Sequence, residues 1–130
     1  MTKPTALRFL YALFSFAIIA IGVLHMATTF RLSGTTAAKV WFFGAGIALV
    51  LAGVLNLLNR QYGLRAFGVR ATTIATNVFM LCFAGIAARL TNASAGEQIF
   101  LLSVLASTLV LSAFRSASLG ALTSQPGENR

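Results

Sequence analysis

The only histidine of the chain, His25, lies in the apolar run 6–29, about seven residues beyond its middle. At about 1.5 Å per helical residue, this puts the imidazole about 10 Å toward the outer end of a membrane helix. One hypothesis is a small pocket in which His25, with Thr29 and Trp41 at its mouth, binds a polar head group, a quinone oxygen or a proton. The alternative is a structural histidine whose ring nitrogen bonds a neighbouring hydroxyl, such as that of Thr29 or of a serine in the run 97–118.

A second group of polar side chains lies near the opposite membrane face. At a helical rise of about 1.5 Å per residue, this group of side chains lies where the runs 40–59 and 71–90 approach the segment that connects them. Side-chain amides can bridge membrane helices, and each such bond contributes about 0.6–2 kcal/mol. We therefore interpret this group as a helix-packing cluster rather than a substrate site. Its members are Asn56, Asn59, Thr73 and Asn77.

The segment between these two runs, 60–70, is predicted to be an interfacial loop or a short amphipathic turn. It carries Arg60, Arg65 and Arg70, which we expect to fix the membrane topology and to contact anionic lipid head groups.

Several kinds of chemistry lack the residues that they require. No acidic residue lies within an apolar run, which argues against a proton-coupled exporter, and Glu97 is expected at a helix start. The single cysteine, Cys82, cannot form an internal disulfide or a Cys-x-x-Cys pair, and we expect it to be a small buried residue. One histidine cannot provide both axial ligands of a haem within one chain. We predict no metal site, no cofactor and no catalytic residues, and an enzyme is the less favoured class.

The composition indicates an integral membrane protein. Of the 130 residues, 58% are hydrophobic and 9% are charged, against about a quarter charged in soluble domains. The sequence predicts an all-α protein, an antiparallel bundle of four transmembrane helices in one domain, 1–122. The expected spans are about 6–29, 40–59, 71–90 and 97–118, followed by a disordered cytoplasmic tail, 123–130.

Small and polar residues form stripes along three of these spans. In the run 6–29, six residues follow one another at intervals of alternately four and three positions and so share one helix face, which should face the bundle. They are Tyr11, Ser15, Ile18, Gly22, His25 and Thr29. A second seam follows the run 71–90: Thr73, Asn77, Met80, Ala84 and Ala88. The run 40–59 has small residues on two faces, one with Gly44, Ala48 and Ala52 and the other with Gly46 and Gly53. We expect this helix to be the central packing element, its second face meeting another helix or a second copy of the chain.

Basic residues predict the orientation. The formal charge is +8, but the bases are distributed between apolar runs, so topology and anionic lipid explain them better than nucleic acid. Three bases are expected on one side: Arg31, Lys39 and Arg89. The other seven share the side of both termini: Lys3, Arg8, Arg60, Arg65, Arg70, Arg115 and Arg130. Both termini are therefore expected in the cytoplasm, and the protein in the cell inner membrane.

The pattern resembles the small four-helix bacterial inner-membrane proteins grouped as DoxX-like. The resemblance depends on Gly22-Val-Leu-His25 and on the glycine-rich run from Trp41 through Asn56 to Asn59, and it covers the first half of the chain. It implies the four-helix fold. Some members are linked to respiratory quinol oxidation, but no catalytic residues carry over.

Two functions follow as hypotheses. The leading one is an accessory or lipid-interacting membrane component that acts through helix contacts, as a homo-oligomer or within a larger membrane complex. The alternative is a binder or carrier of a small amphipathic molecule, a quinone or lipid, in a pocket near His25. Membrane lipids are the expected partners in both cases, and nucleic acid is not.

Overall fold

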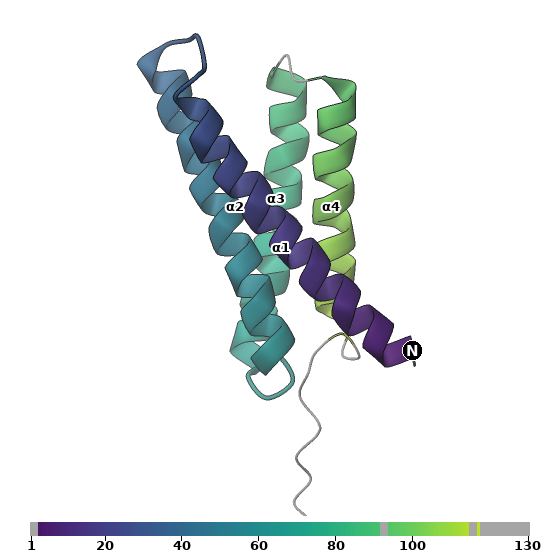
Figure 1. Ribbon diagram of the computed structural model, residues 1–130. Helices are drawn as coiled ribbons and strands as arrows, with labels where there is room; N and C mark the ends of the chain where they lie inside the picture. The colour runs from purple at the N-terminus through teal and green to yellow at the C-terminus, as the bar shows by residue number, and fades with distance from the viewer. Residues whose placement is uncertain (1–2, 92–93, 115–116, 118–130) are drawn as a thin grey trace, which may run out of the picture.

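The computed structural model describes residues 3–91, 94–114 and 117, and it is a bundle of four helices (Figure 1). They are α1 (Lys3–Thr29), α2 (Thr36–Tyr62), α3 (Phe67–Leu90) and α4 (Ala95–Ala113). Each is long and apolar enough to cross a membrane, since about 20 residues suffice. The predicted all-α fold of four transmembrane helices is confirmed, and the chain is a multi-pass membrane protein.

Local hydrogen bonds define where two of the helices begin. The hydroxyl of Thr35 accepts a bond from the amide of Ala38 and caps α2. Ser94 caps α4 with a complete capping box, in which its side chain accepts from the Glu97 amide and the Glu97 carboxylate accepts from the Ser94 amide. Both caps supply partners to backbone amides that a helix start leaves without one.

The helices differ in extent from the spans expected from hydropathy. Helix α2 begins four residues earlier and ends three residues later than 40–59, and α3 begins at Phe67. The expected loop 60–70 is therefore wrong in extent, because only residues 63–66 connect the two helices. A charged side chain interrupts a hydropathy run without interrupting a helix. Helix α4 ends at Ala113, five residues before the predicted end, and the predicted tail 123–130 lies outside the described residues.

Helices α1 and α2 pack closely through glycines. A Cβ atom at Gly22 would lie 2.6 Å from the carbonyl oxygen of Gly46, and one at Gly46 would lie 2.7 Å from that of Gly22. Farther along, a Cβ at Gly53 would lie 2.5 Å from Cγ1 of Ile19. The second small-residue face of α2 is thus covered by α1 of the same chain.

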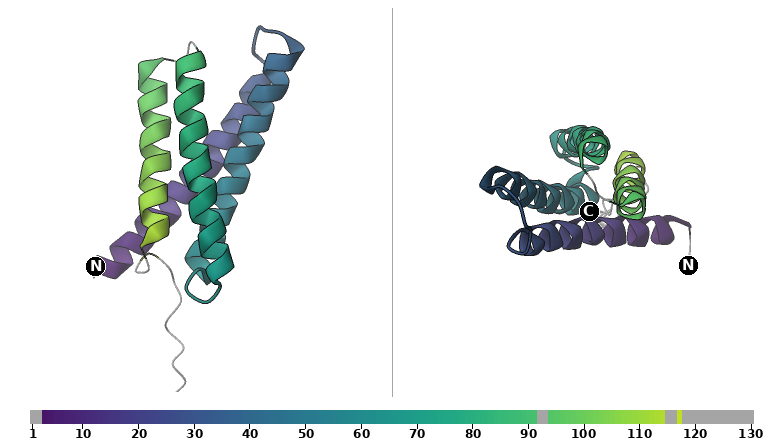
Figure 2. Two further views of the ribbon diagram at one scale, coloured as in Figure 1. Left: turned by 180° about the vertical axis from the view of Figure 1, so that it is seen from behind. Right: turned by 90° about the horizontal axis from the view of Figure 1, so that it is seen from above.

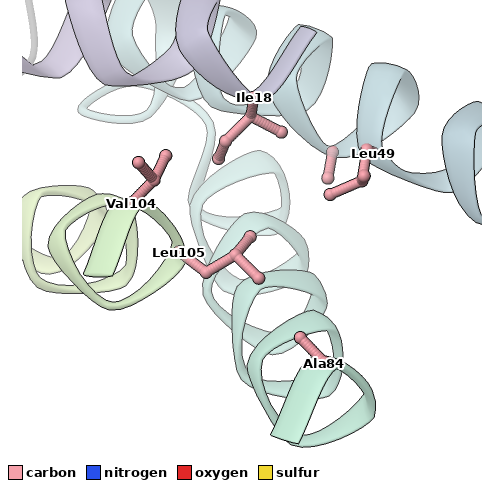
Figure 3. Close-up of a cluster of buried hydrophobic side chains, with 6 residues drawn as sticks. Ile18, Leu49, Ala84, Val104 and Leu105 are labelled. Atoms are coloured by element: carbon pink, nitrogen blue, oxygen red, sulfur yellow. The ribbon is translucent and has the colours of Figure 1, made fainter. Parts of the chain in front are cut away.

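The pair α1–α2 diverges from the pair α3–α4 toward one end of the bundle (Figures 1 and 2). We call the end at which α1 and α3 end and α2 and α4 begin the open end, and the end with the loop 63–66 the closed end. Between them, a core cluster draws side chains from all four helices, and they point into the space between the ribbons (Figure 3). Its buried members are Ile18, Leu49, Ala52, Ala84, Val104 and Leu105.

The predicted stripe on α1 faces the bundle. Tyr11, Ser15 and Ile18 are fully buried, and Thr29 is nearly so. On α3, Thr73, Asn77 and Ala84 are buried as expected. The expected burial of Cys82 is wrong, because the thiol is exposed. Cys82 lies two residues before Ala84, about 200° away around the helix, and so faces away from the bundle.

Candidate functional site

The divergence of the two helix pairs leaves a cleft of about 740 Å³ at the open end. Its walls come from all four helices, with Phe42 and Ala45 on α2 opposite Phe83 and Ala87 on α3. Its inner end is formed by Leu49, Ala84 and Leu105, which belong to the core cluster. Ligand pockets in proteins typically measure about 300–1,000 Å³, so the cleft has room for one ligand of moderate size.

The cleft is about as deep as one leaflet of a bilayer. Along α2 its lining runs from Lys39 to Leu49, ten residues, and therefore about 15 Å at the helical rise. The hydrocarbon core of a bilayer is about 30 Å thick, and half of it is about 15 Å. Below the mouth the lining side chains are almost all aliphatic or aromatic. This shape and polarity match a hydrocarbon chain whose polar end remains at the mouth.

His25 lies in the wall of the cleft with its ring held on two sides. Its Nδ1 is 3.2 Å from the carbonyl oxygen of Ile21, and its ring stacks on Phe42 with the centroids 4.4 Å apart and the planes at 15°. A carbonyl oxygen only accepts hydrogen bonds, so Nδ1 carries a proton, and in the neutral ring Nε2 is an acceptor. The imidazole is therefore oriented by two contacts, and its Nε2 has no hydrogen-bond partner among the described residues.

Two charged side chains lie on opposite walls of the mouth. Lys39, in the first turns of α2, is half-buried, and Glu97, in the first turn of α4, is exposed. Neither takes part in an ion pair within residues 3–91, 94–114 and 117. Oε2 of Glu97 accepts from the amide and the hydroxyl of Ser94, which hold the carboxylate in place. Beside it, Nε2 of Gln98 donates to the carbonyl of Ala88 and connects α4 to α3.

Of the three residues expected at the pocket, the structure places two in the lining of the cleft and one outside it. His25 and Trp41 line the cleft, and Trp41 is 73% exposed, so it belongs to the mouth rather than the interior. Thr29 is not part of the lining. Its side chain is buried, and its hydroxyl donates to the carbonyl of His25 one turn earlier.

The expected polar cluster lies at the closed end, where three of its four members meet in one network. Asn56 and Asn77 exchange two side-chain hydrogen bonds of 2.9 Å, and Tyr11 of α1 donates to Oδ1 of Asn56 at 2.9 Å. Asn59 donates to the Tyr11 hydroxyl at 2.8 Å and to the carbonyl of Ser112 in α4 at 3.3 Å. Every helix contributes a group, so the network fastens the bundle at this end.

The other residues expected near this end make backbone contacts. Thr73, the fourth member, donates to Val69 of its own helix at 2.7 Å and reaches Leu55 of α2 at 3.4 Å. Arg60 donates from Nε to the carbonyl of Arg8 in α1. Arg70 donates to the carbonyl of Ala113, the last residue of α4, whose oxygen has no partner within its own helix. The contact of Arg60, Arg65 and Arg70 with lipid head groups stays a prediction.

Sequence reasoning missed Tyr11 as the centre of the closed-end network and Lys39 as a group at the cleft. Tyr11 was already on the buried stripe of α1, so its hydroxyl required a partner at the level of Asn56 and Asn59. Lys39 was counted only as a topological charge. The signal that could have placed it was the helix start at Thr35, which brings Lys39 into α2 two residues before Trp41.

The part of the chain that the structure describes contains no cluster of three or more potential metal ligands. Compared with models of known families, with curated proteins and with solved structures, the chain gives no match. The resemblance to DoxX-like proteins thus stays a prediction, and any function must be argued from the cleft.

Proposed function

We propose that this protein binds one membrane lipid, with a hydrocarbon chain in the cleft and the head group at its mouth. The observation that carries the proposal is an apolar cleft of about 740 Å³ that is one leaflet deep and has its charged side chains at the rim. Burial of apolar surface against its walls would hold the chain. An amphiphile would enter sideways from the bilayer, between the diverging helix pairs.

The open end then faces the outer leaflet. This orientation is supported by Arg60, Arg65 and Arg70 near the closed end, because basic residues favour the cytoplasmic side. Both termini would lie in the cytoplasm, and the inner membrane is the proposed location. A lipid of the outer leaflet would reach the cleft without crossing the bilayer.

The accessory-component hypothesis loses part of its basis. It depended on two small-residue faces of α2, one of them available to a partner. Gly46 and Gly53 of that second face are in contact with α1 of the same chain. A function through partners, including a homo-oligomer, stays a hypothesis, and the lipid-binding proposal is favoured because the cleft gives it a site.

Native mass spectrometry of the full chain tests the proposal. The protein is delipidated in mild detergent and titrated with a phospholipid, and retained lipid is counted per chain. Ala45→Trp places an indole in the cleft, whereas Cys82→Trp adds the same group to an exposed surface of α3. We expect one tightly retained lipid for wild type and for Cys82→Trp, and none for Ala45→Trp.

Three results would contradict the proposal. The first is equal retention by wild type and Ala45→Trp, since the bound lipid would then lie elsewhere. The second is a quinone rather than a lipid as the only retained small molecule from membrane extract. The third is a wild-type protein that retains no lipid while it co-isolates stoichiometrically with another chain, which would restore the accessory role.

A further inference from the structure

The mouth of the cleft offers a donor and an acceptor on different helices. The Lys39 ammonium on α2 donates three hydrogen bonds and accepts none, while the Glu97 carboxylate on α4 only accepts. Both line one cleft, and within the described residues they form no ion pair with each other. Two opposite charges that border a cleft without meeting leave space for a group that carries the complementary charges.

His25 adds a second acceptor on α1. Because Nδ1 donates to the Ile21 carbonyl, Nε2 of the neutral ring accepts, and the stack on Phe42 fixes the plane of the imidazole. A head group that is only an anion would accept hydrogen bonds from Lys39, but it would offer no donor to the Glu97 carboxylate or to Nε2. A head group with an anionic oxygen and an N–H donor matches all three.

Given the lipid binding proposed above, on which this inference rests, we infer that the cleft selects a zwitterionic phospholipid with a primary amine, of the phosphoethanolamine type. Its phosphate oxygens accept from Lys39. Its ammonium donates to the Glu97 carboxylate and to Nε2 of His25. A phosphocholine head group has the same two charges but no N–H, so it keeps the attraction and loses the hydrogen bonds.

Stepwise N-methylation of the lipid amine isolates these hydrogen bonds. Full-length protein is titrated with phosphatidylethanolamine, its mono- and dimethyl forms and phosphatidylcholine, all with the same acyl chains, and with phosphatidylglycerol as an anionic comparison. For wild type we expect affinity to fall by about five- to tenfold from the primary to the quaternary amine. Phosphatidylglycerol should bind more weakly than phosphatidylethanolamine, because the Glu97 carboxylate repels an unneutralised anion.

Three charge-removing variants assign the selectivity to the mouth. Glu97→Gln removes the carboxylate but keeps the capping box, because glutamine serves at that position. It should abolish the preference for the primary amine. Lys39→Gln should weaken all phospholipids by a similar factor. Arg89→Gln, which removes an exposed charge near the same end but outside the cleft lining, should change neither.

The outcomes separate this inference from the lipid-binding proposal. If wild type retains one lipid that Ala45→Trp loses, but binds all head groups equally, the cleft is a lipid site and the head-group inference is wrong. It is also wrong if phosphatidylglycerol binds best, or if Glu97→Gln retains the amine preference. Loss of the cleft lipid itself from wild type would instead overturn the proposed function.

Discussion

At the closed end, groups from all four helices join a single hydrogen-bond network, whereas at the open end the side chains of His25, Lys39 and Glu97 border a cleft without hydrogen-bonding one another. Asn56 alone contacts Tyr11 and Asn77 through its side chain. Lys39 and Glu97 have no such mutual contact in the described part of the chain. The two ends therefore differ in whether the polar side chains of different helices hydrogen-bond one another.

This difference assigns separate roles to the two ends. A buried hydrogen-bond network holds helices in one arrangement, because each donor left without an acceptor in a membrane interior is costly. A cleft with apolar walls and charged side chains at its rim gains binding energy when a ligand supplies apolar surface and polar partners. The closed end should thus determine stability, and the open end should determine binding.

The largest expected contrast comes from one substitution at two positions of α2. Ala45 and Ala52 are seven residues apart, and so lie within about 20° of each other around the helix. Ala52 is 1% exposed in the core cluster, whereas Ala45 lines the cleft. Ala52→Trp should lower the free energy of unfolding by about 3 kcal/mol or more through overpacking. Ala45→Trp should change it by less than about 0.5 kcal/mol.

Reversible unfolding in mixed micelles measures both values, and Cys82→Trp serves as the lipid-facing control. Equal destabilisation by the two alanine replacements would mean that the open end is packed as tightly as the core cluster. The separation of roles would then be wrong.

A smaller effect is expected from Asn56, which belongs to the closed-end network. Asn56→Ala removes three bonds between helices, one with Tyr11 and two with Asn77. At about 0.6 kcal/mol each, the loss is about 2 kcal/mol of unfolding free energy. Ser103→Ala, on an exposed face of α4, should have no measurable effect. Combining Asn56→Ala with Asn77→Ala should be less than additive, and strict additivity would show that the two amides do not interact.

The sequence was sufficient for the fold and for most inward-facing positions. Runs of apolar residues determine helix number, and steps of three and four determine which side faces inward, as for Tyr11, Ile18 and Asn77. The helix ends were less accessible, since Arg60 and Arg70 interrupt the hydropathy but belong to the helices. Cys82 was misplaced because apolar side chains are favoured on both the lipid face and the core face of a membrane helix.

The cleft could be anticipated only in part. Helix length and the position of the lone imidazole predict the depth of the cleft in the membrane. They also predict two of its residues, His25 and Trp41. That Thr29 turns back to the His25 carbonyl, and that His25 bonds Ile21, depends on local rotamers. The divergence of α1–α2 from α3–α4 depends on packing between helices distant in the sequence, for which single-helix periodicity carries no signal.

The smallest expected contrast is between two variants that each remove one tyrosine hydroxyl oxygen. One should lower stability, and neither should change lipid binding. Tyr11→Phe removes one bond to Asn56 and one from Asn59, so the free energy of unfolding should fall by about 1 kcal/mol. Tyr62→Phe removes the same atom from a half-exposed tyrosine at the end of α2 and should change nothing measurable. Neither change touches the cleft, so lipid retention in native mass spectra should match wild type in both. If Tyr11→Phe lost lipid while Tyr62→Phe did not, the closed end would control the cleft, and the two regions would form one functional unit.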